Sequence, residues 1–182
     1  MKQKIRKILA SLIIVSTIII QLPTVLAGAF SDVPTSSPYA NAIETLKNEN
    51  IISGYADGTF KPEQNINRAE FLKILIEANK NIQVNLDEKN LFPDTPKDSW
   101  YSKYVSTAKT LQIVKGYDDG TFKPEQNISS AEAFKIVIET YKLKTVDNES
   151  NYPQFKNEWY YKYLSTIEKS NLNRQFLFRN TD

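Results

Sequence analysis

The sequence predicts an all-α fold built from tandem helix–loop–helix units. The first observation is an internal repeat: residues 54–66 read GYADGTFKPEQNI and residues 116–128 read GYDDGTFKPEQNI, with twelve of thirteen positions identical. The second is the apolar pattern around each copy, whose steps of three and four positions are typical of one helix face. Repeated units more often build a binding or assembly surface than one catalytic centre, so the repeat argues against an enzyme.

The segment 1–27 has the layout of a secretory signal peptide. Four basic residues precede an uncharged run, Ile8 to Ile20, and Val25-Leu26-Ala27 offers a cleavage site before Gly28. The alternative is an uncleaved membrane anchor, but the run is shorter than the roughly 20 residues that a spanning helix needs. We therefore expect export with removal of the segment 1–27.

Charge and composition exclude several classes of function. The chain has 23 Lys and Arg against 21 Asp and Glu, but beyond Ala27 the balance is 19 against 21, a net charge of −2. Such a surface does not attract nucleic acid, so no nucleic-acid partner is expected. The absence of Cys and His excludes thiol nucleophiles, thiolate metal sites and a histidine base. We expect no cofactor.

Three units follow the signal segment, and each opens at a Phe. Phe30-Ser31-Asp32-Val33-Pro34 opens the first, Phe92-Pro93-Asp94-Thr95-Pro96 opens the second, and Phe155 opens the third at a nearly equal spacing. The expected extents, in chain order, are 28–80 for repeat 1, 90–143 for repeat 2 and 153–182 for a partial repeat 3.

The first helix of each unit is predicted from its apolar face. In repeat 1, Ser37 is the expected cap, Pro38 suits the first helical position, and Ala42 and Ile43 lie on the inner face. Corresponding faces recur in the other two units, formed by Tyr104, Val105 and Ala108 in repeat 2 and by Tyr163, Leu164 and Ile167 in repeat 3.

The repeated loop is best interpreted as a tight turn. Asp57-Gly58 and Asp119-Gly120 are turn pairs in which glycine takes the positive φ that other residues resist, and Phe60 is expected to be buried. A Ca²⁺ site at Asp57, or at Asp118 and Asp119, is the alternative, but these carboxylates supply fewer than the six oxygens that Ca²⁺ prefers. The same acids would serve a glycan hydrolase, the enzyme alternative, and the turn explains them better.

The second helix of each unit starts directly after the loop. Asn67 with Glu70, and Ser129 with Glu132, have the spacing of a capping box, in which both side chains bond free backbone amides. An apolar stripe follows in both units, which predicts one helix in each.

Together these motifs resemble the surface-layer homology (SLH) domain. The opening motif, the glycine loop and Asn67-Arg68-Ala69-Glu70-Phe71 follow the family's order across residues 30–142. The resemblance implies a bacterial cell-surface anchoring module, whose helical units usually occur in threes and pack as a pseudo-threefold bundle. Here the bundle is expected to be incomplete, because no second loop and helix follow in repeat 3.

The resemblance also implies a binding site in the grooves between units. Family members bind secondary cell-wall polymer or peptidoglycan-linked glycan there, often through a pyruvylated sugar. Arg68 would meet the ligand's carboxylate, with Asn67 in the family's Thr place and Glu70 completing the motif; a guanidinium suits a carboxylate because it forms two parallel hydrogen bonds. In repeat 2 Ser130 replaces the Arg. The alternative for Arg68 is a solvated residue of the first helical turn.

Trp100 and Trp159 are further candidates for glycan binding. Their rings could stack on the apolar faces of sugars at a groove edge, or they could pack in the core, as most large aromatics do. Both interpretations remain open from the sequence.

The expected function is therefore non-catalytic anchoring of an exported protein at the cell wall or in the surface layer. The alternative is a structural surface protein that acts through protein–protein assembly with little glycan binding. Leu177 and Phe178 motivate the alternative, because unpaired apolar surface often marks an interface. Another SLH chain could then complete the third repeat.

Overall fold

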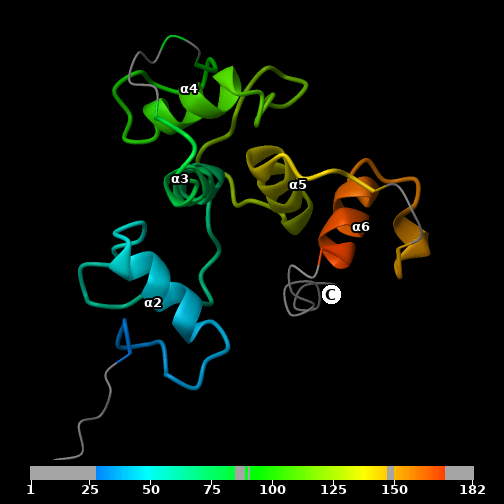
Figure 1. The fold of residues 1–182 in the computed structure, drawn as a ribbon. Coiled ribbons are helices and arrows are strands. Elements are labelled where there is room, and N and C mark those ends of the chain that lie inside the picture. Colours follow the sequence, from blue (N-terminus) through cyan, green and yellow to red (C-terminus); the bar gives the residue numbers. More distant parts are fainter. Residues whose placement is uncertain (1–27, 85–88, 90, 147–149, 171–182) are drawn as a thin grey trace, which may run out of the picture.

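The protein is described here by a computed structural model that covers residues 28–84, 89, 91–146 and 150–170 (Figure 1). The expected signal peptide at 1–27 and the apolar pair Leu177 and Phe178 lie outside these residues. The described part is helical without a strand, which confirms the all-α prediction. Its elements are α2 (Ala40–Asn48), α3 (Arg68–Ala78), α4 (Ser102–Thr110), α5 (Ser130–Tyr141), the 3₁₀-helix η2 (Pro153–Phe155) and α6 (Tyr161–Lys169).

The first helix begins later than predicted. Its N-cap is Tyr39, which makes no side-chain cap bond, so the assignment of Ser37 as cap and Pro38 as first helical residue is wrong. Both belong to a preceding turn, in which the carbonyl of Ser37 accepts from the N–H of Ala40 at 3.0 Å. Ala42 is exposed rather than on the inner face, and only Ile43 of this helix is buried.

The capping boxes are confirmed in both second helices. Asn67 Oδ1 accepts from the N–H of Glu70 at 2.8 Å, and Glu70 Oε2 accepts from the N–H of Asn67 at 3.0 Å. Ser129 and Glu132 form the same reciprocal pair at the start of α5. These bonds satisfy amides that a helix start otherwise leaves free, and they fix the residue at which each helix begins.

The turn interpretation of the loop is confirmed as well. Gly58 and Gly120 have φ of 81° and 79°. In each copy the preceding Asp accepts a hydrogen bond at 3.0 Å from the backbone N–H of the following Thr, Thr59 or Thr121. The acids are thus turn-forming residues, and within the described residues no three acidic side chains gather to hold a metal ion.

Packing occurs mainly between repeats rather than within them. The second helix of repeat 1, α3, packs on the first helix of repeat 2, α4; α5 packs on α6, and α3 and α5 also contact each other (Figure 1). The largest buried cluster accordingly joins two repeats, with Ala69, Leu72 and Ile76 from repeat 1 and Phe92, Tyr104, Val105, Ala108 and Phe122 from repeat 2.

Repeat 1 has a smaller cluster around α2, and its loop is less covered. Phe30 stacks on Phe60 with ring centroids 5.4 Å apart, as Phe92 stacks on Phe122 at 5.7 Å. Phe122 is completely buried, but Phe60 is only half-buried. Phe60, which was predicted to be buried, is therefore only partly buried, whereas its counterpart Phe122, which α3 of repeat 1 covers, is fully buried.

No helix in the described part of the chain is long and apolar enough to span a membrane.

Candidate functional site

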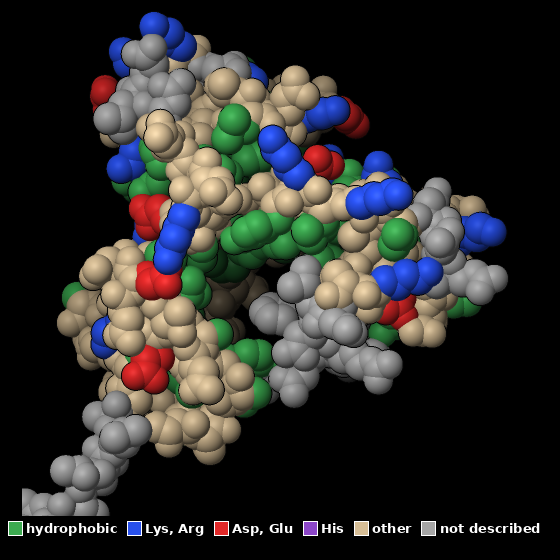
Figure 2. Space-filling model, viewed as in Figure 1, with side chains coloured by type: hydrophobic (Ala, Val, Ile, Leu, Met, Phe, Trp, Pro, Cys, Tyr) green, Lys and Arg blue, Asp and Glu red, His purple; other side chains and the backbone are tan. Residues whose placement is uncertain are grey.

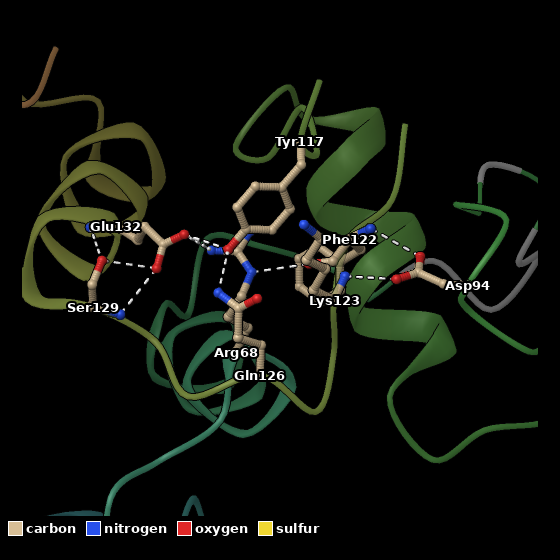
Figure 3. A network of polar contacts seen from close by, with 8 residues as sticks. All are labelled: Arg68, Asp94, Tyr117, Phe122, Lys123, Gln126, Ser129 and Glu132. Atoms are coloured by element: carbon tan, nitrogen blue, oxygen red, sulfur yellow. Dashed lines mark hydrogen bonds and ion pairs between the residues drawn. The ribbon is translucent and has the colours of Figure 1, made fainter. Parts of the chain in front are cut away.

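The joint between repeats 1 and 2 contains Arg68. Its side chain is buried, with the residue 6% exposed, so the interpretation as a solvated residue is wrong. Nε donates to the carbonyl of Phe122 at 2.9 Å, and one terminal nitrogen lies 3.3 Å from a carboxylate oxygen of Glu132 (Figure 3). The first residue of α3 thus bonds to both the loop and the second helix of repeat 2.

Two aromatic rings enclose the same guanidinium. Its central carbon lies 4.7 Å from the ring centroid of Tyr117 and 5.0 Å from that of Phe122. A cation so close to aromatic rings is attracted by their negative faces. Figure 3 shows Tyr117 extending from the loop over Arg68 and toward Glu132.

Glu132 is the acidic centre of the network. Its carboxylate accepts hydrogen bonds from the Ser129 N–H at 2.9 Å, the Ser129 hydroxyl at 2.8 Å and the Tyr117 hydroxyl. Burial by itself would raise the pKa of Glu132, but these hydrogen bonds and the charge of Arg68 together hold the pKa below its ordinary value. The carboxylate is therefore ionised at neutral pH and neutralises Arg68.

Backbone bonds join the two repeats at the same place. The N–H groups of Arg68 and Ala69 donate to the carbonyls of Gln126 (3.0 Å) and Pro124 (3.1 Å). Since the capping box already uses the amides of Asn67 and Glu70, every amide at the start of α3 has a partner. The loop of repeat 2 acts as the cap of a helix in repeat 1.

An aspartate in each opening motif positions the loop, a role that was not predicted from the sequence. Asp94 accepts from the N–H groups of Phe122 (2.8 Å) and Lys123 (2.7 Å), and Asp32 accepts likewise from Phe60 and Lys61, both at 2.7 Å. The backbone bond from Phe60 is the main cause that lowers the pKa of Asp32. The one indication of this role in the sequence is that Asp recurs at the same position of both Phe-x-Asp motifs.

The predicted site residues fall into two groups. Asn67, Arg68 and Glu70 lie together at the start of α3, where the first and third form the cap. Trp100 belongs to repeat 2 and Trp159 lies just before α6, and neither takes part in the Arg68 network. The sequence motif thus marks one joint, and the tryptophans mark a different surface.

Both tryptophans are half exposed, at 53% and 54%, so the core interpretation is wrong for them. Each precedes the N-cap tyrosine of a helix, α4 for Trp100 and α6 for Trp159, and packs edge-on against it. The ring centroids of Trp100 and Tyr101 are 5.2 Å apart at 87°, and those of Trp159 and Tyr160 are 5.5 Å apart at 89°. The edge contacts hold the indoles in place while about half of each residue stays accessible.

Lys135 adds a positive charge beside Trp159, a contact that was not predicted from the sequence. Its Nζ lies 5.6 Å from the ring centroid, and within the described part of the chain it forms no ion pair. Its counterpart in repeat 1, Lys73, is instead paired with Glu77 at 2.5 Å. The sequence shows a lysine at this position in both repeats, but only the structure shows that Lys135 lies near the indole.

The fold and this joint define a helical repeat protein in which the loop of repeat 2 caps the second helix of repeat 1. The S-layer homology domain matches residues 29–72 and 91–134. The chain belongs to this family and contains two of its repeats, which confirms the resemblance.

Curated relatives are proteins of bacterial surfaces. The cellulosome-anchoring protein of Acetivibrio thermocellus is 34% identical over 111 residues, 59% of this chain and 25% of the relative. S-layer protein EA1 of Bacillus anthracis is 33% identical over 127 residues, 67% of this chain and 14% of the relative. The middle cell wall protein of Brevibacillus brevis is 23% identical over 176 residues, 96% of this chain and 16% of the relative. The chain spans a quarter or less of these three relatives.

Proposed function

We propose that this chain is a non-catalytic module that anchors an exported protein at the bacterial cell surface by binding an anionic wall glycan. The ligand would be a secondary cell-wall polymer or a peptidoglycan-linked glycan. The observation that carries the proposal is the pair of equivalently placed, half-exposed tryptophans, each supported by a tyrosine. The names of the S-layer and anchoring relatives support the location at the cell surface.

The chemistry of the Trp159 surface suits an acidic sugar. An indole face offers apolar area to the C–H face of a pyranose, and large aromatics contribute much binding energy with little loss of side-chain freedom. Lys135, 5.6 Å from the ring, supplies a cation for a carboxylate or phosphate substituent. Trp100 offers the aromatic surface without an equally free lysine, since Lys73 pairs with Glu77. We therefore assign the stronger subsite to Trp159.

We propose that Arg68 contributes to glycan binding by exchanging the carboxylate of Glu132 for a carboxylate of the ligand. Its guanidinium already binds a carboxylate, that of Glu132, and Asn67 and Glu70 hold the helix start around it. A ligand carboxylate would replace Glu132 on the guanidinium rather than meet a free cation. The rings of Tyr117 and Phe122 flank the guanidinium, and since Nε already donates to the carbonyl of Phe122, a ligand carboxylate would bind its terminal nitrogens.

The arrangement of helices supports an incomplete pseudo-threefold bundle. In the proposed bundle the second helices α3 and α5 are central, and the first helices α2, α4 and α6 lie outside. The packing of α3 on α4 and of α5 on α6 repeats the same step along the chain. The grooves between units are where the proposed glycan contacts lie.

Sedimentation with purified Gram-positive cell walls, before and after extraction of the wall polymers, tests the proposal. We expect the wild type to bind intact walls, Trp159→Ala and Lys135→Ala to weaken binding about tenfold, and Trp100→Ala to weaken it less. Leu111→Ala is the matched control, because it removes an apolar side chain from a residue that is also about half exposed, at 49%. Equal retention of all variants, or equal binding to extracted walls, would contradict the proposal.

The alternative function, surface assembly with little glycan binding, is favoured by one observation. The loop and first helix of repeat 1 are less covered than their counterparts in repeat 2. Such a chain would bind another protein rather than the wall.

A further inference from the structure

Glu132 has two roles, and its two carboxylate oxygens divide them. Oε2 accepts from the N–H of Ser129 at 2.9 Å and from the hydroxyl of Ser129 at 2.8 Å, which completes the cap of α5. Oε1 lies 3.3 Å from a terminal nitrogen of Arg68 and accepts from the hydroxyl of Tyr117. The contact with Arg68 can therefore open while the cap of α5 stays in place.

Glu70, the counterpart of Glu132 in repeat 1, forms the same cap without an arginine. Its Oε2 accepts from the N–H of Asn67 at 3.0 Å, as Oε2 of Glu132 accepts from the N–H of Ser129. Within the part of the chain that the structure describes, Glu70 forms no ion pair. A capping Glu thus does not need a cation, and the ion pair with Arg68 is an addition that is specific to Glu132.

The ion pair reaches solvent on the side of its carboxylate. The side chain of Glu132 is 16% exposed, against 7% for that of Arg68. Ser129 and Gln126, which lie beside the pair in Figure 3, are both exposed. A ligand carboxylate that approaches from solvent would therefore meet the carboxylate of Glu132 before it reaches the guanidinium.

The wider surface does not attract an acidic glycan. Beyond Ala27 the sequence has a net charge of −2, with 19 Lys and Arg against 21 Asp and Glu. Figure 2 shows basic side chains interspersed with acidic ones over the visible face. Such a surface has no broad positive field that would gather an anionic polymer. A preference for acidic sugars has to come from single cations, and Glu132 already neutralises the one at the joint.

We infer that Glu132 is an internal competitor of the ligand at Arg68 and that it determines which glycans the joint accepts. The inference rests on the proposed glycan binding. Displacing Oε1 of Glu132 separates a partly buried ion pair, which costs free energy. A sugar hydroxyl brings no charge to compensate the guanidinium, whereas a carboxylate restores the ion pair. The joint therefore rejects neutral sugars and binds acidic sugars more weakly than an unpaired arginine would.

Sedimentation of the full chain carrying Glu132→Gln with purified Gram-positive cell walls tests the inference. Gln at the third helical position still completes a capping box, so α5 keeps its start, which circular dichroism checks. We expect this variant to bind walls about tenfold more tightly than the wild type, because the competing charge is gone. Damage to the fold would weaken binding instead. Arg68→Ala added to Glu132→Gln should abolish the gain.

Two further variants serve as controls for charge and for reach. Glu125→Gln removes the same charge from an exposed residue of the same loop, and should change wall affinity by less than about twofold. Glu132→Asp keeps the charge but withdraws it from Arg68 by one methylene group. It should give a smaller gain than Glu132→Gln, in the same direction.

A matched pair of sugars tests the selectivity by NMR titration. N-Acetylmuramic acid carries a carboxylate that N-acetylglucosamine lacks. We expect Glu132→Gln to raise the affinity for the acid about tenfold and to leave the affinity for the neutral sugar unchanged. An equal gain for both sugars would show that Glu132 blocks access without selecting for charge, which overturns the inference.

The inference and the proposed function fail in different ways. Walls that bind the wild type as tightly as Glu132→Gln and Glu132→Asp overturn the inference alone. A gain that persists without Arg68, or that Glu125→Gln reproduces, also overturns it, because net charge would then be the cause. Failure of both the wild type and Glu132→Gln to bind walls contradicts the proposed function and the inference with it.

Discussion

The guanidinium of Arg68 lies 3.3 Å from the carboxylate of Glu132, and this pair joins the first turns of the two second helices. Arg68 opens α3 in repeat 1, and Glu132 is the third residue of α5 in repeat 2. Since Glu132 also completes the cap of its own helix, one carboxylate ties the start of α5 to the start of α3 (Figure 3). Repeats 1 and 2 are therefore coupled and should unfold together.

Replacing Arg68 by Ala should lower the free energy of unfolding by about 3 kcal/mol, because removing one partner of a buried pair leaves the other charge uncompensated. The carbonyl of Phe122 also loses its donor. Urea denaturation followed by circular dichroism measures the change. Ser130→Ala, at the corresponding first position of α5, is the control and should change stability by less than about 0.5 kcal/mol.

The double variant Arg68→Ala with Glu132→Gln separates charge from packing. Neutralising the carboxylate removes the uncompensated charge, so part of the lost stability should return. A loss below about 1 kcal/mol for Arg68→Ala, or no recovery in the double variant, contradicts the coupling described above.

Local features were predictable from the sequence because local chemistry determines them. The capping residues Asn67 and Ser129 act within three positions of the amides that they bond, and the turn at Gly58 depends on the φ of a single residue. The apolar pattern around each copy of the repeat predicted the helices, and the resemblance of these motifs to the SLH family indicated the class of protein. The start of α2 was predicted two residues too early, because its N-cap, Tyr39, makes no side-chain cap bond and no residue type in the sequence indicates such a start.

Contacts across the joint were not predictable. Arg68 and Glu132 are each ordinary helix-start residues, and only the packing of α3 against the loop of repeat 2 buries the arginine. The exposure of Trp100 and Trp159 likewise depends on how the first helices lie on their neighbours, which periodicity does not describe. Lys135 could be aligned with Lys73, but their different partners are set by tertiary structure.

Replacing Asp94 by Ala should destabilise the protein by about 2–3 kcal/mol, since the carboxylate accepts two backbone hydrogen bonds and charged acceptors give the stronger bonds. The loop that it holds carries Phe122 into the main core. Thermal unfolding of the variant against Asp98→Ala, an exposed acid of the same repeat, measures the effect. Similar melting temperatures for the two variants would show that the loop does not need this clamp.

Stability should decline at alkaline pH because of the tyrosines at the joints. Burial and the hydrogen bond to Glu132 raise the pKa of Tyr117 from 10.0 to about 12, and burial together with Glu77 raises the pKa of Tyr104. Above pH 10 the unfolded chain ionises these groups while the folded protein keeps them neutral. Their contribution is therefore complete below pH 10 and is lost as the pH rises toward 12.

The measurement for this prediction is the unfolding free energy between pH 9 and 12, with tyrosinate absorbance as a second signal. Tyr104→Phe should be less stable than the wild type at neutral pH but should show a flatter decline above pH 10. An identical alkaline slope in wild type and variant would show that Tyr104 ionises equally in both states.

Two glycines of the repeat 2 loop should respond very differently to alanine. Gly116 and Gly120 have nearly the same φ, 80° and 79°, so the backbone strain of an added Cβ is equal and amounts to about 1–2 kcal/mol at each. A Cβ at Gly116 would lie 2.6 Å from Cε1 of Phe92 and 2.7 Å from the carbonyl of Thr121, whereas nothing lies within 4 Å at Gly120. Phe92 is buried at 5% exposure and stacked on Phe122, so its ring has no room to move away.

Gly116→Ala should therefore lower the free energy of unfolding in urea by about 2 kcal/mol more than Gly120→Ala does, because the added methyl group overpacks the core. Equal losses would mean that the Phe92 ring yields freely and that the opening motif does not lock the loop.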